Sequence, residues 1–133
     1  MLDQPGTGRG RNKCWKSIRL ELARTPDYPE GSASRTYLLR LPLDEDSLID
    51  ERMLEHAPAL ATVHRYWPSE PDMFGYVIRT PQGWAISYEP GDDAGETVFP
   101  LETHPMREGD YIILSEPDGR PLQFRVASVG PMT

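Results

Sequence analysis

The chain has 133 residues, of which 38% are apolar and 26% are charged, and its net charge is −7. This length fits one domain that can bury enough surface to fold without a disulfide or a metal. No apolar run approaches the roughly 18 residues that a membrane-spanning helix needs. Apolar segments recur throughout, which excludes a collagen-like or wholly disordered chain.

The charges are unevenly distributed along the chain. Residues 1–24 carry six Lys or Arg side chains and two acids, a net charge of +4, whereas the remainder carries −11. An acidic body repels a polyanion within a Debye length of about 8 Å, so nucleic acid is a disfavoured partner. The basic head leaves a loose contact with nucleic acid as a hypothesis.

Composition also bounds the compartment and the domain organisation. Cys14 is the single cysteine, so an internal disulfide is impossible and a reducing cytoplasm is the expected location. The chain begins without the apolar segment of a secretory signal, and no membrane association is expected. Residues 1–13 lack apolar periodicity and are predicted to be a flexible basic tail. Residues 14–130 are predicted to form a single β-rich globular domain.

The first half of this domain predicts two strands separated by a turn. Apolar and polar residues alternate over 16–22, the period of two that a half-buried strand requires. Residues 25–36 have the composition of a turn, with two prolines and a glycine. The same alternation returns over 37–43. Because proline cannot donate to a strand ladder, Pro42 is expected to end this strand or to hold it at a sheet edge.

One segment, residues 43–56, predicts a helix. Asp50 is a plausible N-cap, and Pro58 limits the helix to about two turns because the residue before a proline disfavours helix. The side chains expected to face the core are Ile49, Met53 and Leu54.

The second half predicts mainly hairpins. Residues 61–67 alternate and are rich in aromatic and β-branched side chains, which favours a strand. Two hairpins, an acidic loop and a short strand follow, at residues 76–88, 111–126, 89–96 and 98–101, respectively. With about seven strands and one short helix, the fold class is mainly β (α+β). The predicted architecture is a small antiparallel β-barrel-like or curled sheet.

Several short motifs are spaced along the second half of the chain. They are Arg65-Tyr66-Trp67, Glu70, Asp72 and Gly75, then Trp84 and Tyr88-Glu89-Pro90, then Gly109-Asp110-Tyr111, Asp118-Gly119, Phe124-Arg125-Val126 and Ser128-Val129. With these motifs, residues 37–129 resemble a family of small bacterial proteins. That family has no established activity, so the resemblance implies domain boundaries and adds no chemistry.

Aromatic and arginine side chains gather within a short part of the sequence and carry the main functional hypothesis. Such side chains concentrate binding energy at interfaces, although aromatic residues at period two in a hairpin more often form the core. The hypothesis is a cytoplasmic binding or interaction module whose sheet face engages a protein or a small-molecule ligand. The residues expected to contact the partner are Arg65, Trp67, Tyr76, Arg79 and Trp84.

The alternative hypothesis is a metal-dependent site or an enzyme centred on residues 89–104. Its weak candidate ligands are Asp92, Asp93, Glu96 and His104, because oxygen-rich loops can hold divalent cations. The loop lacks the regular ligand spacing of known calcium loops, and acids in such a loop are commonly only solvated. The sequence contains no recognisable catalytic constellation, so binding is favoured over catalysis, and neither a cofactor nor a metal is expected.

Overall fold

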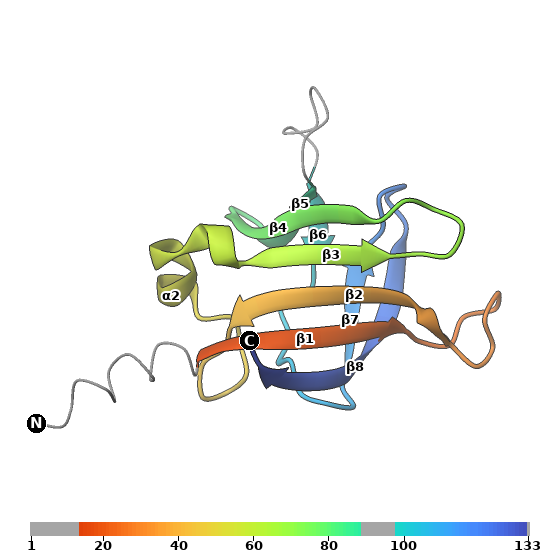
Figure 1. Ribbon diagram of the computed structural model, residues 1–133, viewed down its shortest axis with the longest axis horizontal. Coiled ribbons are helices and arrows are strands. Elements are labelled where there is room, and N and C mark those ends of the chain that lie inside the picture. The colour runs from red at the N-terminus through yellow and green to blue at the C-terminus, as the bar shows by residue number, and fades with distance from the viewer. Residues whose placement is uncertain (1–13, 89–97, 133) are drawn as a thin grey trace, which may run out of the picture.

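A computed structural model describes residues 14–88 and 98–132. Within them, eight antiparallel strands form a closed barrel, in which each strand pairs with the next and β8 pairs with β1 (Figure 1). This confirms the predicted barrel-like sheet with a short helix. The elements are β1 (Trp15–Leu22), β2 (Ser32–Pro42), α2 (Glu51–His56), the 3-10 helix η1 (Pro58–Leu60), β3 (Thr62–Tyr66), β4 (Met73–Thr80), β5 (Gly83–Tyr88), β6 (Phe99–Leu101), β7 (Tyr111–Ser115) and β8 (Pro121–Pro131).

Alternating apolar residues fill the inside of the barrel. Over residues 18–22 of β1 and 37–41 of β2, every second side chain points inward and is almost fully buried. The inward residues of these two strands are Ile18, Leu20, Leu22, Tyr37, Leu39 and Leu41. Residues from β3 to β8, such as Val63, Ile86, Ile112 and Phe124, complete one continuous core. No helix in the described part of the chain is long and apolar enough to cross a membrane.

The predicted turn at 25–36 is shorter than expected, because β2 already begins at Ser32. Residues 32–35 are small or polar and show no apolar alternation, but Ser32 pairs with Leu22 across a bulge in the β1–β2 ladder. Pairing with a neighbouring strand therefore extends β2 beyond its apolar part. β2 ends at Pro42, as predicted from the missing amide donor.

Helix α2 lies at one end of the barrel, opposite the end that carries the β1–β2 loop (Figure 1). Asp50 is the N-cap: its side chain accepts a hydrogen bond from the backbone N–H of Met53 at 3.1 Å. Leu54 is buried in the core, Ile49 is partly buried against it, and Met53 is half-buried. The predicted cap and the buried position of Leu54 are thus confirmed.

β4 is longer than its neighbour β3, and this difference opens one edge of the barrel. The β3–β4 ladder runs from Arg65 opposite Met73 to Thr62 opposite Tyr76. The last hydrogen bond across it joins the N–H of Val77 to the carbonyl of Ala61 at 2.9 Å. Beyond this bond, the segment that precedes β3 leaves the sheet and forms η1 and α2, while β4 continues, paired only with β5.

Candidate functional site

The first candidate site is a polar network in the barrel interior, centred on Glu116. Although this residue begins the β7–β8 turn, it is only 2% exposed. The Tyr37 hydroxyl donates to its Oε2 atom at 2.6 Å. Arg65 donates to its Oε1 atom through Nη2 at 2.9 Å and through Nε at 3.2 Å. The Tyr88 hydroxyl lies 3.1 Å from that of Tyr37 and completes the chain of polar groups.

The surroundings of these groups determine their protonation. Burial raises the pKa of the Tyr88 hydroxyl to about 12. Burial, together with Tyr88 and Glu116, also raises the pKa of Tyr37 well above its ordinary value. Burial disfavours the charged guanidinium of Arg65, but hydrogen bonds to Glu116 and Glu70 outweigh this effect and raise its pKa. At neutral pH, the network therefore holds two neutral tyrosines and a charged arginine.

The network reaches the surface through Arg65. Its Nη1 atom donates to Glu70 at 3.0 Å, and the Glu70 side chain is half exposed. The guanidinium lies over the ring of Trp67, 4.2 Å from its centroid, which is the geometry of a cation–π contact. The small cavity at this point, about 160 Å³, is lined by Arg65, Trp67, Glu70, Met73, Glu116, Pro117, Asp118 and Arg120. Because Arg65 already donates hydrogen bonds to two carboxylates, Glu116 and Glu70, its guanidinium is engaged within the protein at this end of the barrel.

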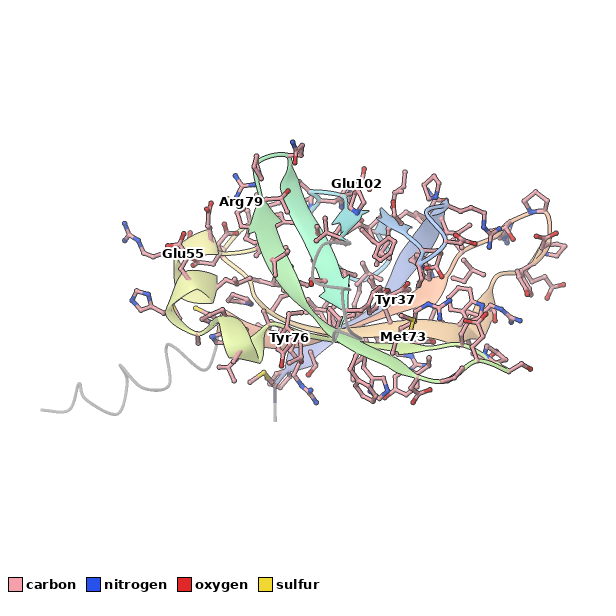
Figure 2. All side chains as sticks on the ribbon, turned by 90° about the horizontal axis from the view of Figure 1, so that it is seen from above. Tyr37, Glu55, Met73, Tyr76, Arg79 and Glu102 are labelled. Carbon is pink, nitrogen blue, oxygen red and sulfur yellow. The ribbon has the colours of Figure 1, made fainter. Side chains whose placement is uncertain are left out.

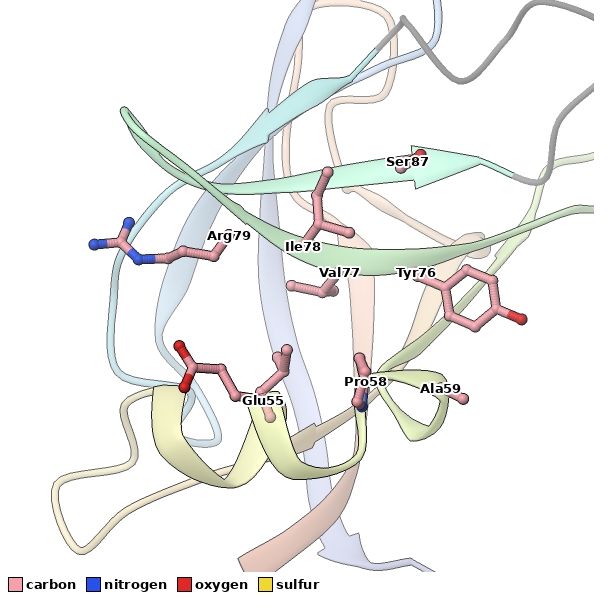
Figure 3. Close-up of a pocket in the computed structure, with 9 residues that line it drawn as sticks. Glu55, Pro58, Ala59, Tyr76, Val77, Ile78, Arg79 and Ser87 are labelled. Carbon is pink, nitrogen blue, oxygen red and sulfur yellow. The ribbon is translucent and has the colours of Figure 1, made fainter.

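The second candidate site is a groove between α2–η1 and β4, with a volume of about 550 Å³ (Figure 3). We call it the α2–β4 groove. Its walls are mainly apolar, and Tyr76 at its border is 36% exposed. Arg79 and Glu55 lie at one end, and Tyr76 and Ala59 lie at the other (Figure 3). The lining residues are Leu54, Glu55, Pro58, Ala59, Tyr76, Val77, Ile78, Arg79 and Ser87.

Contacts on both sides hold Arg79 at the end of the groove. Its Nε atom donates to Glu51 of α2 at 3.3 Å, and its Nη1 atom donates to the carbonyl of Thr80 at 3.2 Å. The guanidinium also lies 5.4 Å from the centroid of the Trp84 ring. Arg79 thus connects the helix to the β4–β5 hairpin and borders the groove.

The five residues that were predicted to form one binding face lie at different places in the structure. Arg65 and Trp67 belong to the polar network, whereas Tyr76 and Arg79 line the α2–β4 groove. Trp84 is 8% exposed and lies below Arg79. Figure 2 shows how far apart the two sites are, with Tyr37 inside the barrel and Arg79 near the end that carries α2.

The candidate metal ligands are described only in part. Asp92, Asp93 and Glu96 lie outside the described residues. His104 is half-buried, and its Nδ1 atom lies 2.8 Å from the carbonyl oxygen of Pro105. Among residues 14–88 and 98–132, no three His, Cys, Asp or Glu side chains are grouped closely enough to hold a metal ion. The hypothesis of a metal site in this loop stays a prediction.

Sequence reasoning missed Tyr37 and Glu116 as site residues. Tyr37 occupies an ordinary inward position of β2, and Glu116 stands in a turn, where an acid is commonly solvated. Nothing local distinguishes this glutamate from an exposed one, because Arg65 and Tyr37, its partners, are 51 and 79 residues away in the chain.

Comparison of the chain with protein-family models, curated proteins and solved structures gives no match. The resemblance to a family of small bacterial proteins therefore stays a prediction.

Proposed function

We propose that the protein is a binding module that takes an apolar segment of a partner protein in the α2–β4 groove. The observation that carries the proposal is the groove itself, with its volume of about 550 Å³, its mainly apolar walls and its open side. Apolar surface of this kind, rimmed by polar groups, is typical of interaction sites.

The residues at the rim support a protein partner. Tyr76 and Arg79 are of the types that carry much of the binding energy at interfaces, and both lie where a partner can reach them. A pocket for a small molecule buries most of its ligand's surface, whereas this groove stays open along one side. An open groove suits a chain segment whose ends continue into solvent. The single cysteine supports the cytoplasm as the proposed location.

The proposal is tested by selecting peptides from a random phage-displayed library on the full-length protein and measuring their affinity for two variants. Ala59→Trp places an indole in the groove, whereas Leu60→Trp places the same group on the neighbouring residue of η1, which does not line the groove. Both positions are exposed, so both variants are expected to fold.

We expect Ala59→Trp to weaken peptide binding at least tenfold, because the indole occupies the space that the peptide needs. Leu60→Trp should bind as the unaltered protein does. Equal affinity for both variants, or the recovery of no binding peptide, would contradict the proposal. Fluorescence polarisation with the selected peptides measures these affinities directly.

A further inference from the structure

The edge of β4 beside the groove carries backbone hydrogen-bonding groups that have no strand partner in residues 14–88 and 98–132. In an antiparallel strand, the N–H and C=O groups of alternate residues point to the same side. The N–H of Val77 points towards β3, where it bonds to Ala61, so the N–H and C=O of Arg79 point to that side too. Among the described residues, no strand pairs with β4 on this side beyond Val77.

The free edge and the α2–β4 groove coincide. Val77, Ile78 and Arg79 form one wall of the groove, and Leu54, Pro58 and Ala59 form the other (Figure 3). α2 and η1 therefore stand apart from β4 in the direction in which β3 would have continued. Residues 78–80 of β4 pair with β5 on one side and with no described strand on the other. This part is roughly 10 Å long at about 3.3 Å per residue, enough to pair with a short extended segment.

The charge beside the groove points to the chemistry of that segment. Helix α2 carries Glu51 and Glu55 against Arg52, whereas the four acids that precede it line a separate cavity with Cys14 and Lys16. Glu55 lines the groove, and Glu51 is next to it, bonded to Arg79. The one arginine in the groove lining is thus already paired, whereas Glu55 has no ion-pair partner within 4.0 Å among the described residues. An incoming segment with Lys or Arg next to its apolar part complements this surface.

We propose that the groove binds an extended apolar segment with flanking Lys or Arg residues as an additional strand on the edge of β4. This inference rests on the proposed function and specifies how the partner is recognised. Main-chain bonds to Arg79 supply affinity, and the apolar walls accept alternate side chains of the added strand. Glu55 selects the cationic flanks.

The first test uses synthetic nine-residue peptides that share one apolar β-branched centre and differ only in having Lys, Ser or Glu flanks. Each peptide is also made with a single backbone N-methyl group at every position in turn. An N-methyl group blocks the hydrogen bond of one amide and leaves the side chain intact. Affinity for the full-length protein is measured by fluorescence polarisation.

We expect the Lys-flanked peptide to bind at least tenfold more tightly than the Glu-flanked one. N-methylation should weaken binding at the position whose amide donates to the carbonyl of Arg79 and not at the two neighbouring positions, because only alternate amides of an extended strand face β4. Glu55→Lys should reduce the preference for cationic flanks, whereas Glu30→Lys, an exposed acid in the β1–β2 loop, should leave it unchanged.

The second test measures amide hydrogen exchange by NMR. In the free protein, the Arg79 amide should exchange much faster than the Ile78 amide, whose residue pairs with Ala85 of β5. Binding of the Lys-flanked peptide should slow exchange at Arg79 at least tenfold and leave Ile78 unchanged.

The outcomes separate this inference from the proposed function. Peptides that bind in the groove, lose affinity in Ala59→Trp, and show neither a position sensitive to N-methylation nor protection of Arg79 would overturn strand addition and leave the binding module intact. Equal affinity for Lys and Glu flanks would overturn the cationic partner. If no peptide of either set binds, the proposed function itself fails.

Discussion

At the scale of single residues, the barrel interior depends on how the two oxygens of Glu116 are satisfied. One accepts two N–H groups of Arg65, and the other accepts the hydroxyl of Tyr37. A buried carboxylate without such partners costs several kcal/mol, on the order of 3–5 when one member of a buried pair is removed. The network therefore holds β2, β3 and the β7–β8 turn together, because removing one partner leaves another buried polar group without its hydrogen bond.

The tyrosines of this network make stability depend on alkaline pH. Burial raises the pKa of Tyr88 from 10.0 to about 12, so between these values the folded protein holds a proton that the unfolded chain has released. The stabilisation is complete below pH 10 and falls above it, by up to about 1.4 kcal/mol per pH unit for each such tyrosine. Urea denaturation should therefore give a lower free energy of unfolding at pH 11 than at pH 9.

Two matched variants test whether the buried tyrosines cause this fall in the free energy of unfolding at alkaline pH. Tyr88→Phe should reduce the difference between pH 9 and pH 11, because one titrating hydroxyl is gone. Tyr111→Phe should leave the difference unchanged, since Tyr111 is 49% exposed on the outer surface of β7. If the two variants behave alike, the alkaline sensitivity does not come from the buried network.

At the scale of elements, the close approach of β4 to β5 depends on Gly75. A Cβ atom at this position would overlap the carbonyl oxygen of Ser87 and lie 2.7 Å from the Cα atom of Tyr88. Both are backbone atoms of the paired strand, so they cannot move aside without disturbing the ladder. The same displacement would shift Tyr88, a member of the polar network.

We therefore expect Gly75→Ala to lower the free energy of unfolding by about 1–3 kcal/mol, the usual cost of inserting a group into a closely packed site. The control is Gly130→Ala in β8, where an added Cβ meets nothing within 4 Å. This change should stay within about 0.5 kcal/mol of the unaltered protein. Thermal and urea denaturation of the two variants measure the difference, and a similar loss in both would contradict the backbone overlap.

At the scale of the whole molecule, the ladder between β1 and β8 closes the barrel. Residues 128–131 of β8 pair with Lys16 to Arg19 of β1. Closure pairs the edges of β1 and β8, which would otherwise be free to pair with other chains. The two ends of the described chain are therefore brought together by the element that completes the fold (Figure 1).

Deleting residues 128–133 should open this ladder and expose the edge of β1. We expect a melting temperature lower by at least 10 °C or the loss of cooperative unfolding, together with concentration-dependent association. Deleting Thr133 alone keeps every residue of the described ladder and should have no effect. Calorimetry and size-exclusion chromatography measure both properties. A cooperative monomer after the longer deletion would show that β8 does not close the barrel in this way.

The period-two pattern made the barrel class predictable, because a strand with one buried face repeats its apolar residues at every second position. Asp50 and the turn that begins at Glu116 were equally readable, since capping and turn formation depend on a few adjacent residues. The candidate site was only partly predictable. Arg65 and Arg79 look alike in the sequence, yet one is buried between carboxylates and the other is exposed at the end of a groove.

By itself, then, the sequence determined that segments with period-two alternation become strands, that Asp50 caps the helix and which residue types are available for binding. Tertiary structure alone decided that Glu116 is buried beside Arg65. It also decided that β4 extends beyond β3, so that no strand of the described residues pairs with Arg79 on that side. The physical reason is the distance along the chain over which each interaction acts. Periodicity and capping act between near neighbours in the chain, whereas a buried ion pair and an unpaired strand edge depend on segments that meet only when the barrel closes.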